Sequence, residues 1–201
     1  MTAKGKIILD LCGGTGAWSA PYAVAGYDVR IITLPEYDVR CYRPPEKVYG
    51  VLAAPPCTEF SLAKGNRPRN FYEGMEVVEA CLRIIWRCRF SNKVAFWALE
   101  NPVGFLRQFL GKPAFVFEQW QYGELLVKKT DLWGYFWPPK PTVKTKPTEG
   151  MMERYPNGKT NARCLSTPDC PAWLKDKHLA RQDLRSITPA GFARAFFEAN
   201  K

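Results

Sequence analysis

Apolar and polar positions alternate along residues 7–137 in a strand, helix, strand order. The short apolar runs typical of buried strands lie at 7–11, 28–33, 48–54 and 94–99. The stretches expected to be helical lie at 18–25 and 72–90, and in the second of them apolar residues recur every three to four positions. This order predicts an α/β fold, with a mainly parallel sheet covered by helices on both faces.

The pattern changes after residue 115. Segments 116–120 and 131–137 resemble strands with no helix between them, which predicts an antiparallel terminal hairpin. Residues 138–185 are rich in proline, lysine and arginine and show little periodicity, so we expect them to be irregular. An apolar stripe returns in a helix that runs to residue 200. We therefore divide the chain into an α/β domain (1–137), a short basic segment (138–185) and a C-terminal helix returning to the domain (186–201).

Charge favours a polyanionic partner. The 201 residues carry a formal net charge of +10, and residues 140–185 hold ten Lys/Arg against five Asp/Glu. Each neutralised phosphate releases counterions, so an excess of positive charge favours nucleic acid. The basic segment is either a recognition segment or a solvated loop. A basic protein with no such partner is the alternative.

The remaining composition excludes several classes of protein. No apolar run approaches the ~20 residues of a membrane span. The start of the chain does not resemble a signal peptide, and seven cysteines, an odd number, fit a reducing compartment. We expect a cytoplasmic monomer with no membrane partner.

A glycine loop, Asp10 to Gly16, connects the first strand to the first helix. Small residues at the carboxyl end of a parallel strand let a ligand approach the backbone closely. The loop lacks the Gly-Lys-Ser/Thr of a phosphate loop and the full dinucleotide spacing. Asp10 could face a cofactor ammonium group or order its water. Asp38, after the second strand, could accept a hydrogen bond from an adenine or ribose, or could pair with Arg40.

A second loop presents a cysteine. Pro55-Pro56-Cys57 directly follows the third strand, and proline fixes φ, so the turn is stiff and the thiol is aimed outward. Such a thiol is a candidate nucleophile. The alternative is a small buried apolar residue, the commonest role of a cysteine thiol.

A third segment, Glu100-Asn101-Pro102, is expected to follow the strand that ends at Leu99, on the same sheet edge as Cys57. Trp97 and Phe105 are expected to desolvate Glu100 partly. Burial raises a carboxyl pKa and allows the group to donate or hold a proton. A thiol and an acid on neighbouring strand ends suit addition to an electron-poor ring.

In this order and spacing, the three segments resemble the cytosine-C5 DNA methyltransferases, most closely small phage-encoded members. The segments that carry the resemblance are Asp10 to Ser19, Pro55 to Ser61 and Glu100-Asn101. Weaker likenesses lie in Gln121 to Gly134 and in Arg185 to Thr188. The resemblance implies a Rossmann-like methyltransferase fold, S-adenosylmethionine as cofactor and DNA as substrate. In a phage-encoded member the host cytoplasm would be the site of action, and protection from restriction the purpose.

The resemblance also implies roles for residues. The implied catalytic residues are Cys57, Glu100, Asn101 and Lys129. The implied cofactor-binding residues are Asp10, Leu11, Cys12, Gly13, Gly14, Thr15, Gly16, Trp18, Asp38, Pro55, Ser186 and Thr188. The implied nucleic-acid-binding residues are Ser61, Lys64, Arg67, Arg69 and Lys128. Lys64, Arg67 and Arg69 lie in a loop that should close over the DNA strand.

The implied mechanism begins with attack of Cys57 on C6 of a flipped-out cytosine while Glu100 engages N3. C5 then becomes an enamine-like carbon and is methylated, and loss of the C5 proton with elimination of Cys57 restores the ring. RNA, a free cytosine nucleotide or a variant cofactor would use the same chemistry. A non-catalytic DNA-binding homologue is the alternative from another class.

The chain departs from the family pattern at several positions. Cys12 replaces an aromatic residue, Pro102 replaces valine, and the basic residue near the base is only Lys128 or Lys129. The segment 138–185 is short for a target recognition domain. The protein therefore recognises a short DNA sequence, recognises no specific sequence, or depends on a protein partner for recognition. Two cysteines and the single histidine, which are Cys164, Cys170 and His178, supply at most three zinc ligands. A structural zinc site takes four, so we expect no metal.

Overall fold

The computed structural model describes residues 3–91, 94–124, 128–147, 152–154, 160–162, 184 and 186–201. The strands are β1 (Ile7–Leu11), β2 (Asp28–Ile32), β3 (Val48–Ala53), β4 (Phe96–Pro102), β5 (Phe115–Glu118), β6 (Lys129–Tyr135), β7 (Met152–Arg154) and β8 (Thr160–Ala162). The α-helices are α1 (Ala20–Val24), α2 (Phe71–Ser91), α3 (Arg107–Leu110) and α5 (Ala190–Asn200), and the 3-10 helices are η1 (Leu62–Lys64) and η2 (Gln119–Tyr122).

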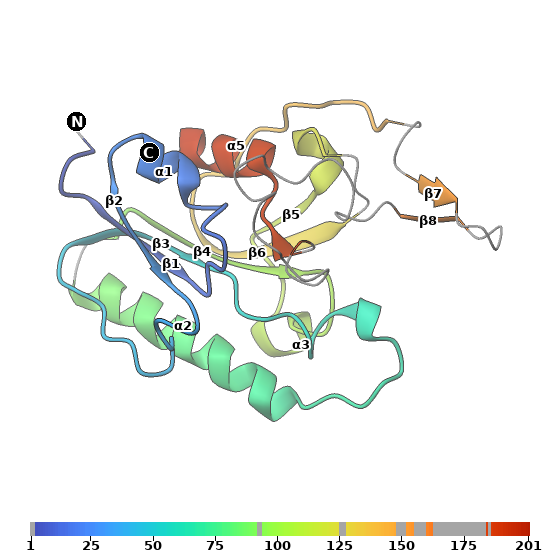
Figure 1. Cartoon of the computed structure of the whole chain (residues 1–201), viewed down its shortest axis with the longest axis horizontal. Coiled ribbons are helices and arrows are strands. Elements are labelled where there is room, and N and C mark those ends of the chain that lie inside the picture. The colour runs from blue at the N-terminus through green and yellow to red at the C-terminus, as the bar shows by residue number, and fades with distance from the viewer. Residues whose placement is uncertain are drawn as a thin grey trace.

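Six strands form one sheet in the order β2-β1-β3-β4-β6-β5 (Figure 1). β2, β1, β3 and β4 are parallel to their neighbours, whereas β6 runs antiparallel to both β4 and β5. β6 enters the sheet between β4 and β5, so it pairs along both of its edges. The fold is therefore the predicted α/β, Rossmann-like fold, a mainly parallel sheet that ends in an antiparallel hairpin.

Helices cover both faces of the sheet, as the sequence predicted. α2 lies on one face, and α1 and α5 lie on the other (Figure 1). Leu9 and Leu99 belong to the core on the α2 face, whereas Ile8 and Ala98 belong to the core on the α5 face. Because successive strand residues point to opposite faces and both faces are covered, β1, β3 and the first half of β4 are apolar almost throughout.

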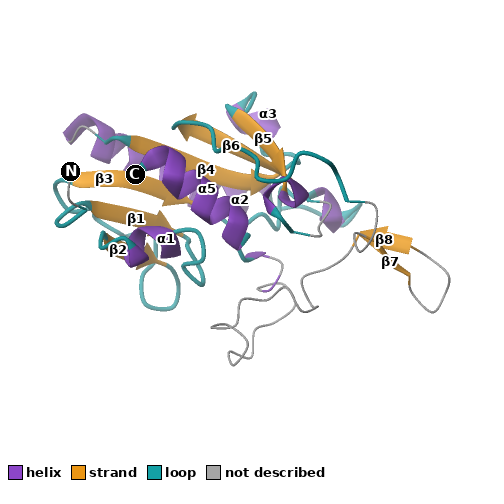
Figure 2. Cartoon of the chain, turned by 90° about the horizontal axis from the view of Figure 1, so that it is seen from above, coloured by secondary structure: helices purple, strands orange, loops and turns teal. Residues whose placement is uncertain are grey.

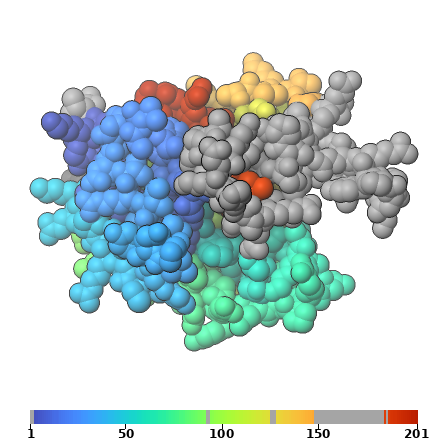
Figure 3. Space-filling model, viewed as in Figure 1, coloured from blue at the N-terminus to red at the C-terminus, as the bar shows by residue number. Residues whose placement is uncertain are grey.

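The last helix packs onto the sheet through aromatic side chains. Phe192 stacks on Phe117 with ring centroids 4.0 Å apart and planes 5° apart. Phe196 contacts Trp18 edge-on at 5.4 Å. Figure 2 shows α5 lying across the central strands, and in Figure 3 the C-terminal residues (red) lie beside the N-terminal part of the chain (blue). The segment that precedes α5 thereby lies beside Glu100 at the carboxyl edge of the sheet, whereas Asn200 at the end of α5 bonds to Trp137 beyond β6.

Several boundaries differ from the predictions. The first helix starts at Ala20, because Trp18 turns into the core instead of opening the helix. β4 continues through Pro102, because β6 supplies a partner strand along its whole length. η2 separates β5 from β6, and the segment expected to be irregular contains β7 and β8, which pair with each other. No helix in the described part of the chain is both long and apolar enough to cross a membrane.

Candidate active site

Three loops meet at the carboxyl edge of the sheet. Leu11 is in register with Ala53, and Ala53 with Leu99, so β1, β3 and β4 reach this edge side by side. The N–H of Ala54 donates to the carbonyl of Leu11 at 2.9 Å, which joins the start of the cysteine turn to the start of the glycine loop. In α/β sheets, ligands bind in crevices beyond this edge.

The turn that carries Cys57 is held from both sides. The Cys57 carbonyl accepts from the N–H groups of Phe60 (3.0 Å) and Ser61 (2.8 Å), so the chain turns immediately after the thiol. The side-chain amide of Asn101 donates to the carbonyl of Pro55 at 3.0 Å, and this bond is buried. Cys57 is partly exposed. The structure therefore ties the predicted nucleophile turn to the strand that carries the predicted acid.

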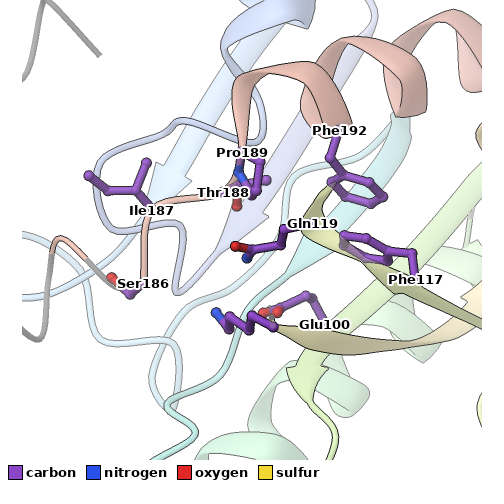
Figure 4. Close-up of a pocket in the computed structure, with 9 residues that line it drawn as sticks. Glu100, Phe117, Gln119, Ser186, Ile187, Thr188, Pro189 and Phe192 are labelled. Atoms are coloured by element: carbon purple, nitrogen blue, oxygen red, sulfur yellow. The ribbon is translucent and has the colours of Figure 1, made fainter. Parts of the chain in front are cut away.

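Glu100 borders a small pocket on the α5 face. It follows Ala98 by two residues in β4, so it points to the same face of the sheet. Burial is the main cause that raises the pKa of Glu100, nearby Lys128 lowers it, and Asp131 raises it. The pocket has a volume of about 10 Å³, which is room for about one water molecule. The lining residues, shown in Figure 4, are Glu100, Phe117, Gln119, Lys128, Ser186, Ile187, Thr188, Pro189 and Phe192.

The prediction that Trp97 and Phe105 desolvate Glu100 was wrong. Trp97 is one of the residues packed against the core on the α2 side of the sheet, because it differs from Glu100 by an odd number of positions. Phe105 is partly exposed and lies beneath the Arg69 guanidinium, 4.6 Å from it. The apolar wall beside Glu100 comes instead from the stacked pair Phe117 and Phe192.

The two neighbouring lysines lie in different places. Lys128 lines the pocket with Glu100. Lys129, predicted as a catalytic residue, is 61% exposed and its ammonium lies 3.5 Å from the Glu118 carboxylate. The geometry therefore favours Lys128 as the basic residue near the site, whereas the sequence favoured Lys129.

The Asp10 side chain packs under the glycine loop. It is fully buried, and the Ser19 hydroxyl donates to its Oδ2 at 2.5 Å. A Cβ on Gly13 would lie 2.5 Å from the Asp10 carboxyl carbon, so only glycine fits above this carboxyl group. Cys12 and Gly14 both have φ near +55°, and a Cβ on Gly14 would meet nothing within 4 Å. The loop therefore presents open backbone on its outer side, while the Asp10 carboxyl group faces inward.

Replacement of Asp10 by Asn should flatten the pH dependence of stability. Burial raises the pKa of Asp10 from 3.8 to about 6, so the folded state keeps a proton that the unfolded state loses first. The contribution of this group is present below pH 3.8 and is lost as the pH rises through 6, a loss of about 3 kcal/mol. Asp10→Asn removes this decline because an amide does not titrate in this range, and the fold is kept because the amide oxygen can still accept from Ser19. Denaturant unfolding between pH 4 and 7 measures the slope.

Asp28→Asn is the matched control. Arg30 holds the pKa of Asp28 below its ordinary value, so this carboxylate stays ionised above pH 4 and its loss should leave the slope unchanged. An unaltered slope in Asp10→Asn would contradict the prediction.

Other implied cofactor residues have structural partners. Leu11 and Trp18 are core residues. The Cys12 sulfur lies 3.9 Å from the sulfur of Cys81 on α2. Asp38 forms the ion pair with Arg40 at 2.6 Å, which was the alternative to a cofactor contact.

The basic loop after Cys57 is internally bonded. Glu59 accepts from the Lys64 ammonium at 2.6 Å, and so neutralises part of the predicted phosphate-binding charge. Arg69 donates to the carbonyls of Glu59 and Gly65, and Arg67 to that of Lys64. The Ser61 hydroxyl accepts from an N–H of η1. These contacts give the loop a defined shape in the absence of any ligand.

Four buried polar atoms at this edge have no hydrogen-bond partner among the described residues. They are Asp10 Oδ1, Asn101 Oδ1, Gln119 Oε1 and Thr130 Oγ1. The same is true of Trp18 Nε1, Tyr22 Oη and Trp97 Nε1 elsewhere in the core. Buried polar atoms are nearly always satisfied, so an exception that borders a pocket, as Gln119 does, is a candidate for completion by a ligand or water. Gln119 and the aromatic wall were missed from the sequence, where the only signal was a polar residue two positions after Phe117.

No metal site is evident in the described ranges, where no three His, Cys, Asp or Glu side chains gather. Cys164, Cys170 and His178 lie outside the described residues.

Comparisons with known proteins give a likeness in structure and none in sequence. No protein-family model matches the sequence, and no curated protein matches it. The fold is similar to the crystal structure of a candidate DNA modification methyltransferase encoded within an E. coli prophage, with a TM-score of 0.47 and 15% identity. The match covers 65% of this chain and 47% of that chain, so this chain spans about half the length of that protein. The function therefore rests on the residues of the site itself.

Proposed function

We propose that this protein is a DNA cytosine-C5 methyltransferase that uses S-adenosylmethionine. One observation carries the proposal: a partly exposed thiol on a stiff turn and a partly buried carboxyl group with a raised pKa stand on adjacent strand ends, joined by the Asn101–Pro55 hydrogen bond. A pure binding protein has no need of this pair.

The two side chains would activate the ring together. The Cys57 thiolate adds to C6, the N3 nitrogen takes the proton of Glu100, and C5 becomes nucleophilic. After C5 has been substituted, it loses its proton to solvent, Glu100 recovers its proton from N3, and the S–C6 bond breaks to release Cys57. The raised pKa of Glu100 suits this role, because desolvation favours the protonated form, which is the form that can donate a proton.

The glycine loop would hold the cofactor. S-adenosylmethionine, when bound, supplies the electrophilic methyl group for C5. The open backbone at Gly14 lets a ligand approach closely, and Thr188, just before α5, borders the same pocket as Glu100. Ser186 lies beside it in that lining. These residues fit a ligand that extends from β1 towards the acid.

DNA is the proposed substrate because the chain is strongly basic and its chemistry requires an exposed base. A net charge of +10 favours phosphate contacts. A stacked base cannot reach a thiol at a sheet edge, so the target nucleotide must be flipped out. The pocket beside Glu100 has room for about one water molecule, so the residues around Glu100 would have to move apart to admit the base.

The direct test is nucleoside mass spectrometry after incubation of plasmid duplex with the protein and methyl-deuterated S-adenosylmethionine. Labelled 5-methylcytosine in DNA is the expected product. Parallel reactions on RNA and on cytidine nucleotides separate the other substrates, because label in either and none in DNA would reject the DNA assignment. Absence of label in all three would reject the methyltransferase.

A further inference from the structure

Gln119 is buried and incompletely bonded. It is 2% exposed, lies at the start of η2 directly after β5, and its Oε1 has no hydrogen-bond partner among the described residues. A buried acceptor left without a donor destabilises a protein. Such a group is expected where a ligand or a water completes it.

The position of this side chain points to a ligand. Figure 4 shows Gln119 extending between Glu100 and Thr188, beside the stacked rings of Phe117 and Phe192. Its backbone N–H donates to the carbonyl of Lys128 at 3.3 Å, which fixes the start of η2 against the segment that precedes β6. The amide therefore faces the same space as the proposed acid.

The neighbouring glutamine shows what a structural role looks like in the same helix. Gln121 Oε1 accepts from the N–H of Glu118 at 2.7 Å, and the Glu118 side chain accepts in return from the backbone of Gln121. This capping box satisfies the helix start without Gln119. Two glutamines two positions apart thus differ in that one is bonded within the fold and the other presents an unbonded oxygen to the pocket.

The unbonded oxygen complements one edge of cytosine. Cytosine presents an amino donor at C4 beside the N3 acceptor, whereas uracil and thymine present a carbonyl oxygen at C4 beside an N–H. An acceptor next to Glu100 would pair with the amino group and would repel the carbonyl. We infer that Gln119 is a specificity residue, whose Oε1 accepts a hydrogen bond from the 4-amino group of the target cytosine while Glu100 engages N3. This inference rests on the proposed function.

The test compares cytosine and uracil in one reaction. A plasmid strand treated with bisulfite, which converts its cytosines to uracils, is annealed to its untreated complement. The duplex is incubated with methyl-deuterated S-adenosylmethionine, and labelled 5-methylcytosine and labelled thymine are measured together. Both target bases then meet the same enzyme, and no target sequence need be known.

Gln119→Leu should lower the ratio of cytosine to uracil methylation by about tenfold or more, because a site built around a substrate hydrogen bond discriminates strongly. Its melting temperature should be unchanged or higher, since the variant removes an unsatisfied buried group. Gln121→Leu, the matched control, should lower the melting temperature and leave the ratio as in the wild type.

Two results would overturn the inference alone. The first is an unchanged ratio of cytosine to uracil methylation in Gln119→Leu, which would mean that a structural water completes the oxygen. The second is an equal change of this ratio in both variants. In either case, methylation of cytosine by the wild type would still support the proposed function. A wild-type protein that transfers no label to either base would reject the proposed function, and the inference would fall with it.

Discussion

Cys57→Ala should abolish methylation of cytosine while leaving the fold intact. The variant lacks the sulfur that adds to C6, and without this bond C5 stays too electron-poor to accept an electrophile. Loss of a nucleophile of this kind lowers the rate by about 10³-fold or more. The measurement is label in 5-methylcytosine under single-turnover conditions, with a melting curve alongside.

Cys41→Ala is the matched control, because this thiol is exposed on the loop that follows Asp38, next to the Arg40 carbonyl that accepts from Arg83 of α2. It should retain full activity. DNA containing 5-fluorocytosine should form a covalent adduct with the wild type and with Cys41→Ala but not with Cys57→Ala. Residual methylation by Cys57→Ala above about one part in a hundred would refute nucleophilic catalysis at this position.

Glu100→Gln should lower the rate by about 10²- to 10⁴-fold, the usual contribution of a positioned acid. An amide can donate a hydrogen bond to N3 but cannot transfer a proton. Burial raises the pKa of Glu100 above its ordinary 4.5, so the acid should remain protonated to a higher pH than an exposed glutamate and should lose activity above that point. The wild-type rate should therefore fall at high pH, and the variant should lack this fall.

Glu118→Gln provides the control for a carboxylate outside the pocket. Glu118 is paired with Lys129 and Lys146 and bonded to the indole N–H of Trp120. Its replacement should affect stability more than rate and should leave the high-pH fall in place. The acid role of Glu100 is excluded if Glu100→Gln retains the wild-type rate and pH profile.

The sheet could be predicted from sequence because its strands are apolar on both faces. Ile7–Leu11 and Val48–Ala53 are uninterrupted apolar runs but for one aspartate, one tyrosine and one glycine, and the structure has them within one residue of the predicted bounds. The length of β4 was not predictable, because Glu100 and Asn101 are polar and are held in the strand by pairing with Leu132 and Asp131. Such pairing depends on a partner far along the chain.

The site could be predicted only in part for the same reason. Cys57 and Glu100 were found because each comes directly after an apolar run that ends at the same edge of the sheet. Gln119 and Phe192 come to the pocket through the folding of η2 and α5, which local patterns do not report. Asp10 and Lys64 looked available to ligands in sequence, whereas Ser19 and Glu59 occupy them. The sequence shows that a side chain is charged or polar, but it does not show which residue of the folded protein already binds that side chain.

The hydrogen bond from Asn101 to Pro55 fixes the strand ends that carry the thiol and the acid independently of the loop that follows Cys57. The spacing of thiol and acid is inherited from two adjacent strands, and no residue of the loop between Gly65 and Arg69 contributes to that bond. Changes in that loop that keep the Arg69 bond to the Glu59 carbonyl can therefore accumulate without moving the thiol or the acid. A lineage built on this arrangement can acquire new target preferences through its loops while its chemistry stays constant.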